Sequence, residues 1–218
     1  MKKNNYFILM SGMFLMIIMM GCFGGGNKNE EDISRFTSLE LEQMGWQMFK
    51  EGRFLDAEKY FEELTKREEH FYLVGHGGLG WTFLKTYKYQ NSRLEFQKFF
   101  VLDTLNLYAP ADSLTRDVRA GQVLVNSALS EHVDLIAASS VFTASNNTNN
   151  NWKFRYDNTI DVIDMRLLRA ASQVALKNFT DAYAMVRLIE PSFETNINTV
   201  EGRLLLVQKI EEMIFDRS

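Results

Sequence analysis

The sequence predicts an all-α fold in which antiparallel helix pairs stack into a solenoid. Beyond residue 36, most segments repeat apolar residues at intervals of three and four, which is helical spacing. The whole chain has only two prolines, Pro110 and Pro191. In addition, one pattern of small and aromatic residues recurs along the chain, as in repeat architectures. We therefore expect about four helix pairs followed by a C-terminal capping helix.

Residues 1–21 have the layout of a secretory signal peptide. Lys2 and Lys3 give a positive start, and residues 7–20 are apolar with two exceptions. A bilayer-spanning helix needs about 20 apolar residues, whereas this stretch is shorter and is followed at once by glycines and polar sequence. We therefore expect a cleaved leader rather than a permanent membrane span.

A single cysteine follows the apolar stretch. Met19, Met20, Gly21 and Cys22 resemble the bacterial lipobox, which has a large aliphatic residue three positions before the cysteine and a small residue directly before it. Met20 departs from the small residue that is usual there. A buried thiol is the alternative, but Cys22 lies among glycines that offer nothing to pack against, and it is the only cysteine of the chain.

The lipobox resemblance implies a covalent membrane anchor. It implies diacylglycerol on the sulfur of Cys22, cleavage before this residue and usually an acyl chain on the new amino terminus. At about 0.8 kcal/mol per buried methylene, two or three chains make a durable anchor. In enteric bacteria an aspartate after the cysteine retains a lipoprotein in the inner membrane. Phe23 therefore implies an outer-membrane lipoprotein that faces the periplasm, if the cell is Gram-negative.

Residues 22–36 are predicted to form a flexible tether, because they are rich in Gly, Asn, Glu and Lys and lack apolar periodicity. Residues 37–218 are then one helical domain. Without Lys2 and Lys3 the chain has 22 basic and 28 acidic residues, a formal charge of −6. Nucleic acid is not an expected partner, because its binding requires clustered Lys and Arg.

The first two helices have clear boundaries in the sequence. Thr37 and Glu40 have the spacing of a capping box, in which each side chain binds the other residue's backbone N–H. The first helix is predicted to run from there to about Glu51. Gly52 then ends it, and a second helix is expected to begin near Phe54.

This helix pair recurs with the same internal spacing. Each unit has a small residue, an aromatic residue, a second small residue and a large residue at matching positions. Two helices that cross closely need a small residue on each at the contact and a bulky one beside it. The three matching sets are Gly45, Phe54, Ala57 and Phe61; Gly80, Tyr89, Ser92 and Phe96; and Ala170, Phe179, Ala182 and Val186.

A further unit is expected between the second and last of these. We predict that it starts near Ser113 and centres on Gly121, with its second helix over residues 130–140. Its spacing matches the other units less well. Residues 199–216 are predicted to form the capping helix that an end repeat needs. The apolar face assigned to it consists of Leu204, Leu205, Val207, Ile210, Ile214 and Phe215.

The first unit, GWQMFKEGRFLDAEKYFEEL, resembles the tetratricopeptide repeat, which has small residues at its eighth and twentieth positions and aromatics around them. From Gly45 to Gly80 is 35 residues, against about 34 in that family. The resemblance extends from residue 37 to about residue 191. It implies a solenoid in which the first helices of successive repeats line a concave groove.

The family resemblance places four candidate partner-binding residues in that groove. Trp46 and Trp81 stand at equivalent positions, and Lys50 and Lys85 follow four residues later on the same helix faces. Such pairs can bind an extended peptide through indole contacts and amines that reach carboxylates. In the alternative interpretation both tryptophans fill the seam between helices. The family's carboxylate clamp is incomplete here, so specificity for a C-terminal peptide is not implied.

An insertion follows the third unit. Residues 146–151 are mostly Asn and are predicted to form a surface loop. After them Trp152, Phe154 and Tyr156 alternate with Lys153 and Arg155. These aromatics either fold back onto the solenoid or form a mobile arm that contacts a partner, and the sequence leaves both open.

No motif indicates an enzyme, a metal site or a bound cofactor other than the lipid. Residues 75–80 contain GxGxxG, but a dinucleotide site needs this motif between a strand and a helix, whereas here it falls within a repeat's first helix. His70, His76 and His132 lack metal-ligand spacing. We expect a noncatalytic, lipid-anchored adaptor that binds envelope proteins. The alternative is a lipoprotein that binds a small ligand or glycan for a transport or polymer-export system.

Overall fold

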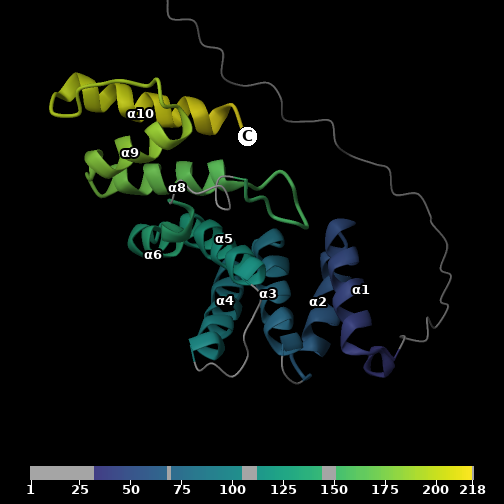
Figure 1. Ribbon diagram of the computed structural model, residues 1–218. Coiled ribbons are helices and arrows are strands. Elements are labelled where there is room, and N and C mark those ends of the chain that lie inside the picture. The colour runs from purple at the N-terminus through teal and green to yellow at the C-terminus, as the bar shows by residue number, and fades with distance from the viewer. Residues whose placement is uncertain (1–31, 68–69, 105–111, 144–150, 218) are drawn as a thin grey trace, which may run out of the picture. The chain divides into compact units, whose positions relative to one another are not determined.

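The domain is built of helices that pack as neighbours in chain order (Figure 1). The computed structural model describes residues 32–67, 70–104, 112–143 and 151–217, which contain nine α-helices, two short 3-10 helices and no strand. The prediction of an all-α fold is confirmed. The elements are η1 (Ile33–Arg35), α1 (Ser38–Lys50), α2 (Phe54–Leu64), α3 (His70–Lys85), α4 (Tyr89–Thr104), α5 (Asp112–Ala128), α6 (His132–Ala138), η2 (Ser139–Phe142), α8 (Val162–Ala175), α9 (Phe179–Ile189) and α10 (Val200–Phe215).

Four pairs of helices account for most of the packing. In α1–α2, α3–α4, α5–α6 and α8–α9, the two helices contact each other and are joined by a turn of three residues. The first helices of successive pairs also contact one another, from α1 to α3, α3 to α5 and α5 to α8. Helix α10 packs on α8 and α9. Each pair therefore buries its apolar faces mainly against its neighbours in the chain.

Two local predictions are confirmed, one at the start of α1 and one in the glycine-rich run of residues 75–80. The Thr37 hydroxyl accepts a hydrogen bond from the Glu40 backbone N–H at 3.3 Å, and the Glu40 carboxylate accepts one from the Thr37 N–H at 2.8 Å. This is the capping box expected there. The glycines of residues 75–80 lie inside α3 and do not follow a strand.

The turns inside the four pairs share one backbone feature. A residue with positive φ lies two positions before the second helix of each pair: Gly52 at 74°, Tyr87 at 60°, Ser130 at 58° and Lys177 at 62°. Only the first is a glycine, although glycine adopts this conformation most readily. The shared turn fixes equivalent positions in all four pairs.

These equivalent positions correct the predicted centre of the third unit. Gly45 and Gly80 lie seven residues before the turn residue of their pairs, and the same count from Ser130 leads to Val123, not to Gly121. Gly121 has a different role. An added Cβ there would overlap the ring of Phe96, which belongs to α4 of the preceding pair. The glycine allows close approach between pairs, whereas the prediction assigned it to the contact within a pair.

The same geometry places phenylalanine rings between glycines of two helices. Phe61 of α2 would be overlapped by a Cβ at Gly45, within its own pair, and by one at Gly78, in the next pair. Phe96 of α4 stands between Gly80 and Gly121 in the same way. Both rings are fully buried. Each ring therefore fills the space left by two glycines that a helix would otherwise disfavour.

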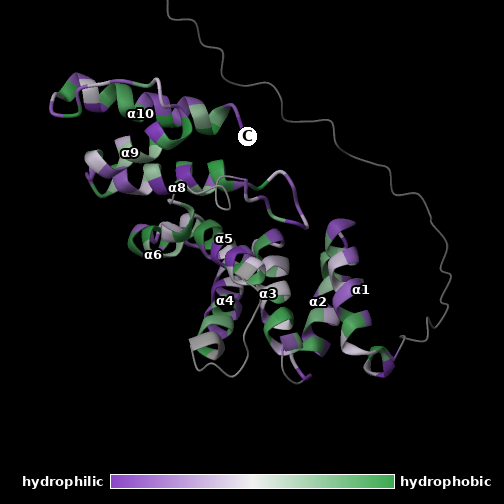
Figure 2. Ribbon diagram, viewed as in Figure 1, coloured by the Kyte–Doolittle hydropathy of each residue, from purple (hydrophilic) through white to green (hydrophobic). Residues whose placement is uncertain are grey.

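The predicted apolar face of α10 is wrong in part. Leu206 and Ile210 are buried, but Leu204 and Phe215 are 56% and 78% exposed, so apolar residues lie on both sides of this helix (Figure 2). The start of α10 determines which side of the helix faces the domain, because Gly202 lies so close to the preceding segment that a Cβ there would overlap the Asn196 carbonyl. Residues spaced by four from this glycine face the domain, which turns Leu204 outward.

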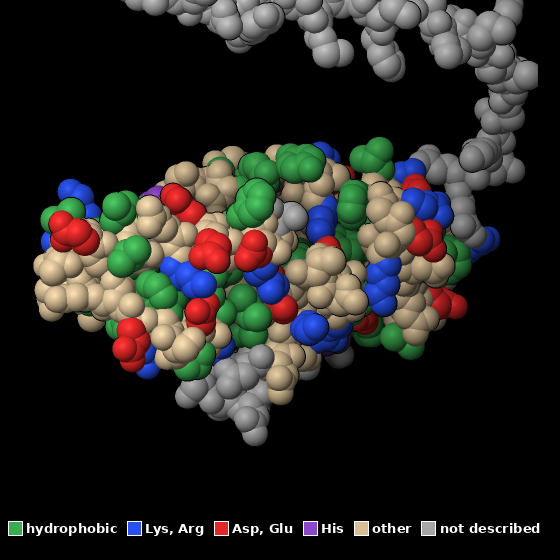
Figure 3. Space-filling view, turned by 90° about the horizontal axis from the view of Figure 1, so that it is seen from above, with side chains coloured by type: hydrophobic (Ala, Val, Ile, Leu, Met, Phe, Trp, Pro, Cys, Tyr) green, Lys and Arg blue, Asp and Glu red, His purple; other side chains and the backbone are tan. Residues whose placement is uncertain are grey.

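Charges of both signs are intermixed on the face shown in Figure 3. Exposed ion pairs join charges of opposite sign, such as Arg53 with Asp56 at 2.8 Å and Lys88 with Glu58 at 3.0 Å. Exposed ion pairs contribute about 0–1 kcal/mol each. The helix contacts, rather than these charges, therefore hold the domain together.

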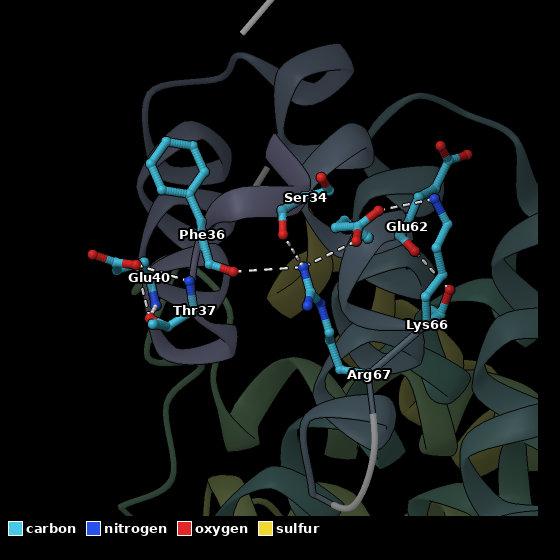
Figure 4. A network of polar contacts seen from close by, with 9 residues as sticks. Ser34, Phe36, Thr37, Glu40, Glu62, Lys66 and Arg67 are labelled. Atoms are coloured by element: carbon cyan, nitrogen blue, oxygen red, sulfur yellow. Dashed lines mark hydrogen bonds and ion pairs between the residues drawn. The ribbon is translucent and has the colours of Figure 1, made fainter. Parts of the chain in front are cut away.

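The predicted tether ends earlier than expected, because residues 33–36 belong to the folded domain. They form the 3-10 turn η1, and Ile33 and Phe36 pack against the hydrophobic core. Arg67 holds this turn, since its Nη2 donates hydrogen bonds to the carbonyl oxygens of Ser34 at 2.8 Å and Phe36 at 3.5 Å and also pairs with Glu63 (Figure 4). Residues 33–218 form one compact unit.

Candidate partner-binding face

A short hairpin precedes α8 and carries the aromatic residues of the insertion. The Phe154 N–H donates to the Ile160 carbonyl at 2.9 Å, and the Val162 N–H donates to the Trp152 carbonyl at 3.1 Å. We call residues 152–161 the aromatic hairpin. Because side chains alternate along such a segment, Trp152 and Phe154 are buried while Lys153 is exposed.

The aromatic hairpin lies directly on the two predicted groove tryptophans. The Tyr156 ring stacks on Trp46 with centroids 3.7 Å apart, and the Phe154 ring stacks on Trp81 at 3.8 Å. Trp46 is 4% exposed and Trp81 is 1% exposed. The aromatics therefore fold back onto the helices, and the face expected to be open at the tryptophans is filled by the chain itself. Binding of a partner at these residues stays a prediction.

A buried carboxylate holds the root of the hairpin. Asp117 of α5 accepts hydrogen bonds from Trp152 Nε1 at 3.0 Å and from Arg155 Nε at 2.8 Å. Burial raises the pKa of Asp117, against the opposing effects of the Arg155 charge and the two hydrogen bonds. The hairpin is thus joined to α5 by a charge-assisted contact as well as by packing.

The two predicted groove lysines also meet this hairpin. Lys85 Nζ lies 2.6 Å from Asp157, and Lys50 Nζ lies 5.3 Å from the centre of the Tyr156 ring, within cation–π range. Burial opposes ionisation of Asp157, but hydrogen bonds from Lys85 and Thr159 outweigh it and lower the pKa of this carboxyl. All four groove residues predicted from the sequence therefore contact one segment of the same chain.

Two hollows of about 450 Å³ each remain beside the hairpin. Lys50 and Tyr156 line both and separate one from the other. We call the first the basic hollow; it is lined by Phe49, Lys50, Gly52, Phe54, Lys85, Arg155, Tyr156, Asp157 and Asn158. The second, the neutral hollow, is lined by Leu39, Glu42, Gln43, Trp46, Gln47, Lys50 and Tyr156.

A third carboxylate with a shifted pKa, that of Glu42, lines the neutral hollow. Burial raises the pKa of Glu42, and the charges of His70 and Arg155 oppose this shift. Sequence reasoning did not select Glu42, Asp117 or Asp157 as site residues. Their role depends on where the hairpin lies, and the alternation of aromatic and basic residues from Trp152 was the only available signal.

One buried polar pair lies apart from this face. His76 Nδ1 of α3 is 2.5 Å from one carboxylate oxygen of Glu95 in α4, and the other carboxylate oxygen of Glu95 pairs with Lys98 at 2.7 Å. Burial disfavours the charged carboxylate, yet the hydrogen bonds from His76 and Lys98 lower the pKa of Glu95. Within the described part of the chain, His76 Nε2 and Trp81 Nε1 have no hydrogen-bond partner. No cavity adjoins this pair among those described above, so we assign it to the packing of α3 on α4.

The described residues hold neither a metal-ligand cluster nor a membrane-spanning helix. In this part of the chain, no group of three His, Cys, Asp or Glu is placed to hold a metal ion. Likewise, none of the helices between residues 32 and 217 that the structure describes is long and apolar enough to cross a membrane. Cys22, the predicted signal peptide and most of the Asn-rich loop lie outside the described residues.

Comparison with known proteins finds no matching family model, no matching curated protein and no matching solved structure. Evidence on function therefore comes from the sequence patterns and from the geometry of this face.

Proposed function

We propose that the chain is a lipid-anchored envelope lipoprotein and a noncatalytic adaptor, with a tetratricopeptide-like solenoid as its binding domain. The solenoid proposal is supported by the contacts between first helices of successive pairs and by the turn that all four pairs share. The partner is an envelope protein that contributes an extended segment. The anchor is lipid on Cys22, and in a Gram-negative cell the location is the periplasmic side of the outer membrane.

One observation carries the adaptor proposal. The face formed by α1 and α3 already holds an extended aromatic segment, with Phe154 on Trp81, Tyr156 on Trp46 and Asp157 on Lys85. This surface therefore has the chemistry that binds an extended peptide, since stacked aromatic rings and charge-assisted hydrogen bonds stabilise such contacts. The two hollows beside Tyr156 are the places where a second segment can continue this contact.

Site-specific photo-crosslinking tests the adaptor proposal. A photoreactive side chain is placed at Gln43 in the neutral hollow or at Asn158 in the basic hollow, both exposed positions. Leu55, exposed on α2 outside both hollows, is the matched control. We use exposed positions because replacing Trp46 or Trp81 would disturb the core rather than the surface.

After irradiation of intact cells and mild detergent extraction, we expect a defined adduct with one envelope protein from Gln43 or Asn158 and none from Leu55. An adduct of equal yield from all three positions, or from Leu55 alone, would contradict binding at this face.

A separate experiment tests the anchor. Growth with a labelled fatty acid should label the wild-type chain, and Cys22→Ala should abolish the label and move the protein from the membrane fraction to the soluble fraction. Labelling that persists in Cys22→Ala would contradict lipidation at this residue. Adaptor binding and anchoring can fail independently, so the two tests are read separately.

A second function is favoured by the size of the hollows. About 450 Å³ falls within the roughly 300–1,000 Å³ of small-molecule sites. We therefore also propose, as the alternative, a lipoprotein that binds a small ligand or glycan for a transport or polymer-export system. Native mass spectrometry with oligosaccharides distinguishes the two, because this alternative requires a saturable complex in the absence of any protein partner.

A further inference from the structure

The basic hollow contains more positive than negative charge. Lys50, Lys85 and Arg155 line it, against the single carboxylate of Asp157. This contrasts with the chain as a whole, which has an excess of acidic residues. A general attraction for anions is therefore absent, and any preference for them must be local to this hollow.

Two of the three cations already have anionic partners. Lys85 pairs with Asp157 at 2.6 Å, and Arg155 Nε pairs with Asp117 at 2.8 Å. Lys50 has no ion pair among the described residues, and its ammonium lies over the Tyr156 ring. The cation–π contact holds the ammonium of Lys50 beside Tyr156, which also lines the hollow, and leaves its charge without an anionic partner.

The hollow also offers apolar walls next to this charge. Phe49, Phe54 and Tyr156 line it, and Phe49 and Phe54 lie edge to face with ring centroids 5.4 Å apart. A ligand that combines a carboxylate with an aromatic or aliphatic neighbour would match both features. Asp157 provides an internal example, since the chain itself directs a carboxylate at Lys85 beside Tyr156.

We infer that the basic hollow binds a carboxylate of an acidic, aromatic-containing peptide segment of the partner, and that Asp157 is an internal carboxylate that competes for Lys85. The incoming carboxylate pairs with Lys50, and its aromatic neighbour lies against Phe54 and Tyr156. This inference rests on the proposed adaptor function and specifies the chemistry of its partner.

Titration calorimetry with the full-length chain in mild detergent tests the inference. The probe is acetyl-Phe-Asp-Glu-Phe-amide, and its neutral counterpart is acetyl-Phe-Asn-Gln-Phe-amide. We expect the acidic peptide to bind more tightly, with an advantage that shrinks as salt is raised. Digalacturonate, a carboxylate without aromatic groups, serves as the glycan probe.

Three substitutions sharpen the test. Lys50→Gln should weaken binding of the acidic peptide about three- to tenfold, as expected for a partly exposed charge-assisted contact. Asp157→Asn should strengthen it about threefold, because the amide keeps the turn contact with Thr159 but releases Lys85. Lys153→Gln, an exposed position of the same hairpin that lines neither hollow, should leave it unchanged.

The inference is overturned if the neutral peptide binds as tightly as the acidic one, or if Lys50→Gln and Lys153→Gln behave alike while both variants keep the wild-type melting temperature. If digalacturonate binds, is weakened by Lys50→Gln and neither peptide binds, the inference is also overturned, because the ligand of the hollow is then an acidic glycan. If the peptide fails but crosslinking at Asn158 succeeds, the adaptor proposal stands and only the ligand chemistry is wrong.

Discussion

The first two helix pairs and the last one reach similar packing with different residues. In α1–α4 the contacts are phenylalanine rings set between glycines, as for Phe61 between Gly45 and Gly78. In α8–α9 the equivalent positions hold Ala170 and Val186, and they form a separate hydrophobic cluster with α10. The shared turn therefore does not require one kind of core. Where the bulky residue is a ring, both neighbouring helices must supply glycines.

The aromatic hairpin extends this difference. Trp152 and Phe154 belong to the hydrophobic cluster of the first helices, whereas the cluster of α8–α10 contains no hairpin residue. The face formed by α1 and α3 is therefore covered by an added segment, whereas the last helix pair is covered by α10. The following experiments test whether the two regions respond differently.

The largest expected effect is the loss of a ring. Phe61→Ala should reduce the free energy of unfolding by about 3–5 kcal/mol, because it removes a buried phenyl group and leaves a cavity between two helices. Val186→Ala, at the equivalent position of the last pair, should cost about 2 kcal/mol, since fewer methylene equivalents leave the core. Chemical denaturation of both variants measures the difference. Equal losses would show that the two cores do not differ as described.

A smaller effect is expected when a glycine is filled. Gly78→Ala should cost about 1–3 kcal/mol, because the new methyl group overlaps the Phe61 ring, and this is only partly offset by the roughly 1 kcal/mol that alanine gains in helix propensity. Ala170→Gly in the last pair should cost about 2 kcal/mol, because it loses that propensity and the burial of one methyl group without any overlap with a ring. In the double variant Gly78→Ala with Phe61→Leu, the smaller side chain should relieve the overlap, so the double variant should lose less stability than the two single variants together. If the two losses simply add, the ring contact is contradicted.

The next effect is a pH dependence at the root of the hairpin. Burial raises the pKa of Asp117 above its ordinary 3.8, so the folded protein holds this proton more tightly than the unfolded chain. Its contribution to stability is then greatest below pH 3.8 and is lost as the pH rises through the raised pKa. The free energy of unfolding of the wild type, measured relative to that of Asp117→Asn, should therefore increase when the pH falls from 7 to 4.

Glu95 is the matched contrast, because its pKa is lowered. Its contribution is present above pH 4.5 and is lost as the pH falls through the lowered pKa. The free energy of unfolding of the wild type, relative to that of Glu95→Gln, should therefore decrease on acidification. Shifts of the same sign in both variants would mean that one of the two assignments is wrong.

The smallest expected effects are at helix caps. Thr37→Ala removes the capping box of α1 and should cost about 1 kcal/mol, and Thr199→Ala removes the cap of α10, where the hydroxyl accepts from the Gly202 N–H at 3.0 Å. Hydrogen exchange should quicken in the first turn of the affected helix alone. Faster exchange throughout α1–α4 in Thr199→Ala would show that the two regions are more strongly coupled than the separate clusters suggest.

Local chemistry explains which parts of the fold could be predicted from the sequence. The capping box at Thr37 and the helical setting of the glycines in α3 depend on residues a few positions apart. The phase of the third unit does not. A glycine such as Gly121 signals a close approach, but the sequence does not show whether the neighbour is in its own pair or in the preceding one. The turns at Tyr87, Ser130 and Lys177 carry no glycine that would have marked the phase.

The candidate site was predictable only in its residue types. The positions of Trp46, Lys50, Trp81 and Lys85 followed from the repeat spacing, and the structure brings all four to one segment. This segment belongs to the same chain, and its contacts with the four residues join positions 70 or more residues apart. The sequence therefore left both the fold-back and the mobile arm open.

If the chain is held by the lipid anchor proposed at Cys22, the contact between Arg67 and the carbonyl oxygens of residues 34 and 36 has a mechanical consequence. A chain held at its N-terminal end and pulled at the other would transmit the force to the domain at this guanidinium before it reaches the first turn of α1. Such a load strains several hydrogen bonds of one side chain together, instead of opening helical bonds one after another. Arg67→Ala should therefore lower the force at which α1 begins to unravel.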